Sequence, residues 1–234
     1  MIKRLFCLLI IISLLTISMI FGLSNPNEFI RERYREHLNT ISDTSDSIYQ
    51  SISWSILTRM NDGFGIICPN IIPNRDIKED VVERINNTIK TTLLSYMESF
   101  VFGTKFPLAC QINLFDSALL SIKYEGEVWT PAKAIKQVFA LNFDVRNGTL
   151  LDIDDIFILD SVLNSLSNGS FTPIKTSGQY YSAEVLKKRY LNNSVISIDN
   201  ANQHNFYISD NKLYLIIDLI TESGFSIYYT DIIK

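Results

Sequence analysis

The sequence predicts an α+β fold in which an antiparallel sheet packs against one long helix and two shorter helices. Several short segments alternate apolar and polar residues between turn residues, which is typical of strands with one buried face. One segment of about six turns carries apolar residues every three or four positions, as a helix packed on a sheet does. Strands and helices do not alternate regularly, and this order favours an antiparallel sheet over a parallel one.

The first strand is predicted from a run of apolar residues on even positions, with Ser51, Ser53 and Ser55 between them. The apolar residues are Ile52, Trp54, Ile56 and Met60, and we expect them to form the buried face. Asn61-Asp62-Gly63 supplies a hairpin turn. The return strand covers residues 65–72, and Pro69 places it at an edge or ends it early.

The long helix follows this hairpin. Asp76 is the predicted cap, with Glu79 three residues later completing a capping box, and Gly103 is the predicted stop. The apolar stripe is expected to face the core and consists of Ile77, Val81, Ile85, Ile89, Leu93, Tyr96 and Phe100.

The remaining elements follow from the same patterns. Strands are expected at residues 108–115, 118–124 and 136–145, with a loop around Gly126 and Pro131 before the last of these. Helices are expected at residues 151–166 and 182–191. The chain then returns to strands, at residues 205–208, 213–219 and 225–229, with Asp210-Asn211 as a turn.

The N-terminus predicts export. Lys3 and Arg4 precede an uncharged apolar run over residues 5–23, and Gly22 and Ser24 suit a signal-peptidase site. We therefore divide the chain into a signal peptide or N-terminal anchor (1–24), a polar spacer (25–48) and an α+β domain (49–234), with a subdomain split near residue 116 as an alternative. The apolar run is also long enough for an uncleaved membrane anchor. In either case the domain is expected outside the cytoplasm.

The composition limits the partners. A formal net charge of -4 and a pI of about 5.2 argue against a nucleic-acid binder, which needs a basic face. The membrane is expected to contact only residues 1–24, if they are not cleaved. Hydrophobic residues make up 47% of the chain, enough to build a core.

Cys68 and Cys110 form an even pair once Cys7 leaves with the signal. In an exported chain such a pair can persist as a disulfide. The alternative is two buried free thiols, since free cysteine is among the most buried residue types.

No catalytic constellation stands out. His37 and His204 are the two histidines, and neither has the neighbours of a nucleophilic or zinc site. Four acids gather at Asp152, Asp154, Asp155 and Asp160, but the spacing fails the calcium-loop pattern, and helix capping explains them better. We expect no metal, no cofactor and no catalytic residue, and the sequence leaves the ligand-binding residues unknown. Aromatic candidates for a binding surface are Trp129 and the pairs Tyr180-Tyr181 and Tyr228-Tyr229.

The segment from Asn142 to Phe157, NFDVRNGTLLDIDDIF, resembles the segment "NFDlktGk.ltl.DlF" of a family of extracytoplasmic domains. This family comprises RsiV-type anti-sigma factors and the N-terminal region of PdaC-type peptidoglycan deacetylases. The supporting pieces follow in the family's order and are Pro69-Asn70-Ile71, Ile85-Asn86, Leu119-Leu120-Ser121-Ile122 and the late Asn205–Asp210 and Leu213–Leu215 hairpin. The resemblance covers about residues 50–234.

The resemblance implies an envelope ligand, since RsiV-type domains bind lysozyme. The family's Gly-Gly-Ala-His stretch is replaced here by residues 126–131, which lack the histidine, and no deacetylase catalytic domain is part of the resemblance. We therefore expect an exported cell-envelope binding or sensing module, without a catalytic site, for a protein (lysozyme-like) or glycan ligand. The alternative is a cell-wall glycan hydrolase or accessory domain that uses carboxylates the sequence does not single out. A flat surface with aromatic side chains would favour binding, and an apolar pocket with two perturbed acids would favour hydrolysis.

Overall fold

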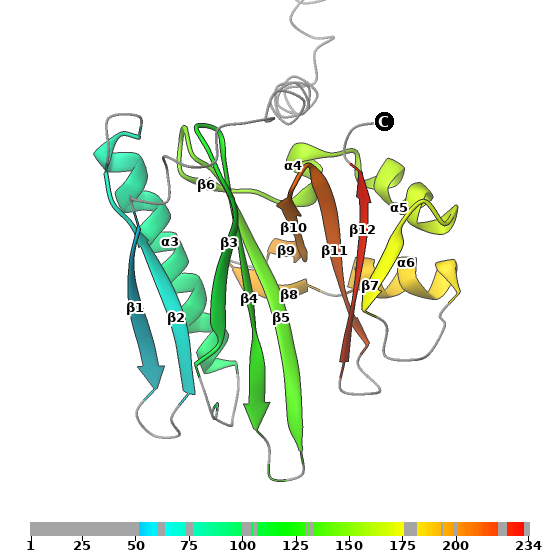
Figure 1. Cartoon of the computed structure of the whole chain (residues 1–234), viewed down its shortest axis with the longest axis horizontal. Coiled ribbons are helices and arrows are strands. Elements are labelled where there is room, and N and C mark those ends of the chain that lie inside the picture. The colour runs from blue at the N-terminus through cyan, green and yellow to red at the C-terminus, as the bar shows by residue number, and fades with distance from the viewer. Residues whose placement is uncertain are drawn as a thin grey trace, which may run out of the picture.

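The computed structural model describes residues 52–59, 64–73, 77–99, 104, 107–129, 131, 133–175, 182–192, 194–198, 201–219 and 224–231. They form the predicted α+β fold, with every named strand pair antiparallel. The sheets face the viewer in Figure 1, and the helices lie behind them. No helix of these residues is long and apolar enough to cross a bilayer. The predicted export segment, the spacer and the Asn61-Asp62-Gly63 turn lie outside the described residues.

The N-terminal half builds a two-stranded hairpin and a four-stranded sheet, which together we call the first sheet. The hairpin of β1 (Ile52–Arg59) and β2 (Phe64–Ile71) is followed by a four-stranded sheet in the order β3-β4-β5-β6. Its strands are β3 (Ala109–Phe115), β4 (Leu119–Trp129), β5 (Ala134–Asp144) and β6 (Thr149–Leu150). A parallel bridge between Ile66 and Leu108 joins the hairpin to this sheet.

The C-terminal half builds a second four-stranded sheet in the order β10-β11-β12-β7. Its strands are β7 (Thr172–Lys175), β10 (Phe206–Ser209), β11 (Lys212–Leu219) and β12 (Gly224–Asp231). Helices α4 (Ile153–Ile156), α5 (Leu159–Ser167) and α6 (Ala183–Asn192) accompany it, and a small hairpin pairs β8 (Ser194–Ile198) with β9 (Ala201–His204). Asp210 and Asn211 both have positive φ, as the predicted two-residue turn requires.

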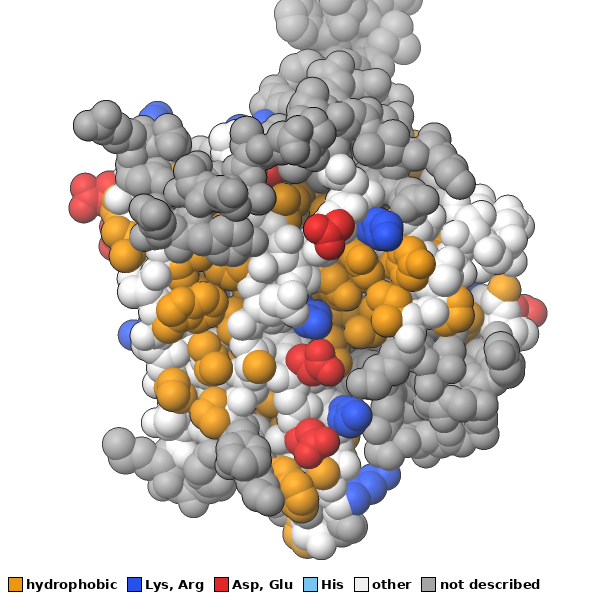
Figure 2. All heavy atoms as spheres, in the orientation of Figure 1, with side chains coloured by type: hydrophobic (Ala, Val, Ile, Leu, Met, Phe, Trp, Pro, Cys, Tyr) orange, Lys and Arg blue, Asp and Glu red, His pale blue; other side chains and the backbone are white. Residues whose placement is uncertain are grey.

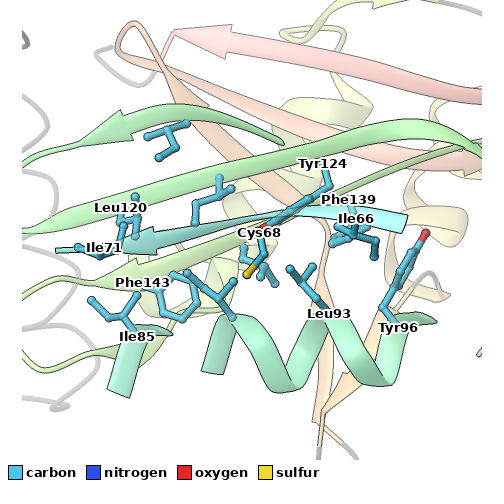
Figure 3. Close-up of a cluster of buried hydrophobic side chains, with 14 of the residues drawn as sticks. Ile66, Cys68, Ile71, Ile85, Leu93, Tyr96, Leu120, Tyr124, Phe139 and Phe143 are labelled. Atoms are coloured by element: carbon cyan, nitrogen blue, oxygen red, sulfur yellow. The ribbon is translucent and has the colours of Figure 1, made fainter. Parts of the chain in front are cut away.

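Helix α3 (Glu79–Glu98) covers the first sheet with the predicted stripe. Ile85, Ile89 and Leu93 are fully buried, and Figure 3 shows α3 side chains rising toward Phe143, Cys68 and Phe139 on the strands. The predicted capping box was wrong. The N-cap is Lys78 and Glu79 is the first helical residue, so Glu79 is not at the third helical position that the box needs. Asp76, Phe100 and Gly103 lie outside the described residues.

The predicted buried face of β1 was also wrong, although the strand itself is confirmed. Trp54 and Ile56 are 53% and 57% exposed. The alternation identified the apolar face correctly. However, β1 is an edge strand that pairs only with β2 among the described residues, and α3 lies on the other side of the hairpin. An apolar face is buried only if another element covers it.

Two further boundaries differ from the prediction for packing reasons. Gly126 lies inside β4, opposite Gln137, and not in a loop. A glycine is needed at this position because a Cβ atom would collide with the Cδ2 atom of Leu108. The helix expected over 151–166 is two helices, since Phe157 and Ile158 adopt extended backbone between α4 and α5. Strands β6, β7, β8 and β9 were not predicted.

Truncation of the stripe tests this arrangement. We expect Ile85→Ala to lower the free energy of unfolding by about 2–5 kcal/mol, because it opens a cavity between α3 and the sheet. Lys90→Ala, on the exposed side of the same helix, should change it by less than about 0.5 kcal/mol. Denaturant titration measures both, and equal small effects would show that the stripe is not core.

Candidate binding surface

The two sheets meet where β5 has an open edge. Strand β6 pairs only with Phe143 and Asp144 of β5. Earlier along β5, the side-chain amide of Asn205 takes the place of a strand: its Oδ1 accepts the Ala140 N–H at 3.0 Å, and its Nδ2 donates to the Val138 carbonyl at 3.1 Å. Asn205 is buried, so these bonds satisfy backbone groups that have lost access to water.

A second buried group of polar side chains fastens β10 to the first sheet. The Ser121 hydroxyl donates to Asn142 Oδ1 at 2.7 Å and accepts the Ile208 N–H at 3.0 Å. Asn142 Nδ2 donates to the Phe206 carbonyl at 2.8 Å. We call Ser121, Asn142 and Asn205 the sheet junction. It fixes β10, and with it the second sheet, relative to β4 and β5.

The front face of the second sheet carries three tyrosines in cross-strand register. Tyr207 pairs with Tyr214, and Tyr214 pairs with Tyr229. Neighbouring residues on each strand point to the opposite face, where Phe206 and Leu213 belong to the core shared with α5 and α6. We call Tyr207, Tyr214 and Tyr229 the tyrosine row.

The rings of the row stack on one another. The Tyr207 and Tyr214 centroids lie 4.4 Å apart with planes 6° from parallel, and the Tyr214 and Tyr229 centroids lie 5.7 Å apart at 30°. Tyr214 therefore has a ring on each side. Such offset stacking adds stability beyond the area buried, so the row is an ordered feature rather than three independent side chains.

Two lysines lie over the outer rings of the row. Lys123 Nζ lies 5.7 Å from the Tyr207 centroid, and Lys212 Nζ lies 5.0 Å from the Tyr229 centroid, both within cation–π range. Lys123 Nζ also pairs with Glu125 Oε2 at 3.3 Å. The electrostatic pattern is thus a strip of phenol rings bounded by positive charge.

Burial, the neighbouring Tyr214 and the Glu125 carboxylate all raise the pKa of Tyr207 above its usual value. Its hydroxyl therefore remains protonated at neutral and mildly alkaline pH and can both donate and accept a hydrogen bond.

The row borders an apolar seam between the sheets. Val138, Ile216 and Ile227 are buried there beside Tyr207, with Ala140 at their margin. Figure 2 shows the result on the front face, where apolar side chains gather at the centre and basic and acidic side chains alternate in a line beside them. Tyr207 is buried in this seam, and Tyr214 and Tyr229 are half-buried.

Of the aromatic residues that the sequence singled out, Tyr229 belongs to the row, while Trp129 lies exposed at the far end of β4. Tyr180, Tyr181 and the side chain of Tyr228 lie outside the described residues. Tyr207 and Tyr214 were missed. The two-residue turn at Asp210-Asn211 contained the signal, because it fixes the hairpin register that brings these two tyrosines together.

The acidic cluster serves helix ends. Asp152 and Asp155 form a capping box on α4, in which Asp155 Oδ2 accepts the Asp152 N–H at 2.8 Å. Asp154 Oδ1 accepts the Leu159 N–H at the start of α5, at 3.1 Å. Within the described residues, no group of three or more His, Cys, Asp or Glu side chains is placed to hold a metal ion.

The remaining candidates lie apart from the tyrosine row. Cys68 is a buried free thiol and Cys110 a half-buried one, and both face the core under the first sheet. His37 and the side chain of His204 lie outside the described residues.

The sheet junction can be tested by removing one amide. We expect Asn142→Ala to cost roughly 1–3 kcal/mol for each buried partner left unpaired, here the Ser121 hydroxyl and the Phe206 carbonyl. Asn87→Ala, on the exposed side of α3, should be nearly silent. Urea titration compares the two variants, and an equally small effect at Asn142 would contradict a junction that holds the sheets together.

Capping makes a different prediction from ion binding. We expect Asp155→Ala to lower the free energy of unfolding by about 0.5–2 kcal/mol, equally in calcium and in chelator, because the lost interaction is a hydrogen bond to the Asp152 N–H. Glu83→Ala, an exposed acid on α3, is the control. A calcium-dependent melting temperature in the wild type that disappears in Asp155→Ala would instead indicate a specific cation site.

Comparison with known proteins yields little. No family model and no curated protein sequence matches the chain. Among solved structures, the chain is similar to the crystal structure of a member of the DUF3298 family from Bacteroides fragilis. The TM-score is 0.36 and the identity 12%, over 76% of this chain and 87% of that one.

Proposed function

We propose that this protein is an exported cell-envelope binding or sensing module that holds a protein or glycan ligand against the tyrosine row. Export is inferred from residues 1–24, and the resemblance to RsiV-type domains suggests a lysozyme-like ligand. The observation that carries the binding role is the stacked strip of Tyr207, Tyr214 and Tyr229 on the sheet face opposite α5 and α6, with Tyr214 and Tyr229 half-buried and Lys123 and Lys212 at its two ends.

The geometry of the row favours a protein over a stacked sugar. A sugar that binds by stacking needs the open face of an aromatic ring, and both faces of Tyr214 already meet tyrosines. A ligand instead meets ring edges and phenol hydroxyls. Tyrosines presented in this way offer apolar area and a hydrogen-bonding group with little loss of side-chain entropy, which is why they are frequent at protein interfaces.

The charges around the row shape the complementary surface of the ligand. Lys212 contributes a positive charge at one end, whereas Lys123 at the other end is partly neutralised by Glu125. The phenol hydroxyls and the two ammonium groups together suit a ligand segment rich in carbonyl or carboxylate oxygens. Such charges affect which ligand binds, and how fast, more than how tightly it is held.

Removing the central ring tests the proposal. We expect Tyr214→Ala to weaken binding of a lysozyme to the purified protein by roughly 10–100-fold, the loss typical of a central tyrosine at an interface. Trp54→Ala is the control, since Trp54 is an exposed aromatic residue that lies on β1, away from the row. Calorimetry or surface plasmon resonance measures both affinities.

A gentler variant separates binding from folding. Tyr214→Phe retains the stacked rings and removes one hydroxyl, so it should keep the melting temperature and still lose several-fold in affinity. The same titrations with soluble peptidoglycan fragments test a glycan ligand. Release of new reducing ends from those fragments would replace the binding proposal with the hydrolase alternative. Equal affinities of wild type, Tyr214→Ala and Trp54→Ala would exclude the row as the site.

A further inference from the structure

A single row of side chains crosses the core side of the first sheet and contains both cysteines. Ser55 pairs with Cys68 across β1 and β2. Cys110 pairs with Tyr124 across β3 and β4, and Tyr124 pairs with Phe139 on β5, where their rings stack at 4.7 Å. Cys68 lies on β2 and Cys110 on β3, so their relative position depends on how these two strands contact each other.

Strands β2 and β3 meet through a short parallel ladder. The Leu108 N–H donates to the Gly65 carbonyl at 2.8 Å, and the Ile67 N–H donates to the Leu108 carbonyl at 3.0 Å, which sets Ile66 opposite Leu108. Continued by two residues along both strands, this register would set Cys68 opposite Cys110 on the same face.

The ladder cannot extend far past the cysteines, and the sequence explains why. In this register the next bond would run from the Cys110 N–H to the Ile67 carbonyl, and the one after it from the backbone nitrogen of residue 69 to the Cys110 carbonyl. Residue 69 is Pro69, which has no N–H to donate. The hairpin is thus joined to the sheet by few backbone bonds at a point where two thiols face each other.

Paired strands lie about 4.8 Å apart, so a continued ladder would hold the two Cα atoms within the separation of roughly 4.4–6.8 Å that a disulfide spans. Cys68 also acts electrostatically on the Cys110 thiol. Burial raises the pKa of Cys110 to about 12, the Tyr124 hydroxyl opposes this shift, and Cys68 adds to it. Burial likewise raises the pKa of Cys68. The fully buried Tyr124 hydroxyl lies beside Cys110 and makes no hydrogen bond of good geometry.

We propose that Cys68 and Cys110 form a disulfide that takes the place of the missing ladder bond and fastens the β1–β2 hairpin to the sheet. This inference uses the export part of the proposed function, because such a bond persists in an oxidising compartment, and it is independent of the tyrosine row.

The reaction is a thiol–disulfide exchange with an oxidised dithiol carrier or glutathione disulfide. One cysteine loses its proton and attacks the carrier disulfide, which gives a mixed disulfide and releases one carrier thiolate. The second cysteine loses its proton and attacks the first cysteine's sulfur, which forms the Cys68–Cys110 bond and releases the second carrier thiolate. The two cysteines are oxidised by two electrons, and the carrier takes up those electrons and both protons.

Burial sets the timing of this reaction. The thiolate is the attacking species, and the raised pKa of Cys110 keeps its thiolate population very small in the folded protein. Oxidation therefore occurs while the core is still closing, and the reduced native protein oxidises far more slowly than the refolding chain.

The test uses the full chain with Cys7→Ser, so that only the two core cysteines remain. The reduced, unfolded protein is refolded with oxidised and reduced glutathione, alkylated, digested and analysed by mass spectrometry. We expect a peptide pair linked through Cys68 and Cys110 and no alkylation at either residue. Complete alkylation of both thiols, or linkage between two copies on a non-reducing gel, would overturn the proposal.

A second measurement tests the fastening role. Reduction should lower the melting temperature of the oxidised protein by roughly 5–15 °C and speed amide exchange in β1 and β2 more than in β4 and β5. The Cys110→Ala variant should not respond to reductant. A linked peptide without any change in melting temperature or exchange on reduction would show that the bond does not fasten the hairpin. Lysozyme affinity is read separately, so failure of the binding proposal leaves this result interpretable.

Discussion

The structure depends on how β5 satisfies its open edge. A strand edge exposes alternating N–H and C=O groups, and leaving them buried without partners is costly. Here the amide of Asn205 supplies both an acceptor and a donor to Ala140 and Val138, as a neighbouring strand would. The amide oxygen and nitrogen are a fixed distance apart, so both hydrogen bonds can form in only one position of Asn205. They therefore also fix the position of the chain just before β10. The second sheet is positioned by this contact and by the bonds of Ser121 and Asn142.

The same contact places the tyrosine row. With β10 held against β5, Tyr207 lies beside Val138 and its ring comes under the ammonium group of Lys123 from β4. The tyrosine row thus begins on the seam between two sheets that have separate cores behind them. Buried hydrogen bonds set the relative positions of these residues, so a surface built from several segments has the rigidity that the proposed recognition would need.

The sequence predicted what local rules determine. The α3 stripe follows from a 3.6-residue period, and the Asp210-Asn211 turn from residues that tolerate positive φ. It failed where a distant neighbour decides. Trp54 alternates as a buried residue does, but no element among the described residues covers it. Gly126 looks like a loop residue, but the close approach of Leu108 is what requires a glycine there. Predicting the tyrosine row would have required the registers of two strand pairs and the sheet junction, and of its three members the sequence singled out only Tyr229.

The Asn142-Phe143-Asp144 segment shows why a resemblance can carry a fold without a function. Asn142 belongs to the sheet junction, and Phe143 is fully buried in the core over α3. Asp144 accepts bonds from the backbone and guanidinium of Arg146 and from the Asn147 amide, which shapes the turn before Gly148. Every part of this motif builds the scaffold. Residues that recognise a ligand, as proposed, are therefore to be sought outside this motif, on the faces that the scaffold positions, and the tyrosine row lies on one of them.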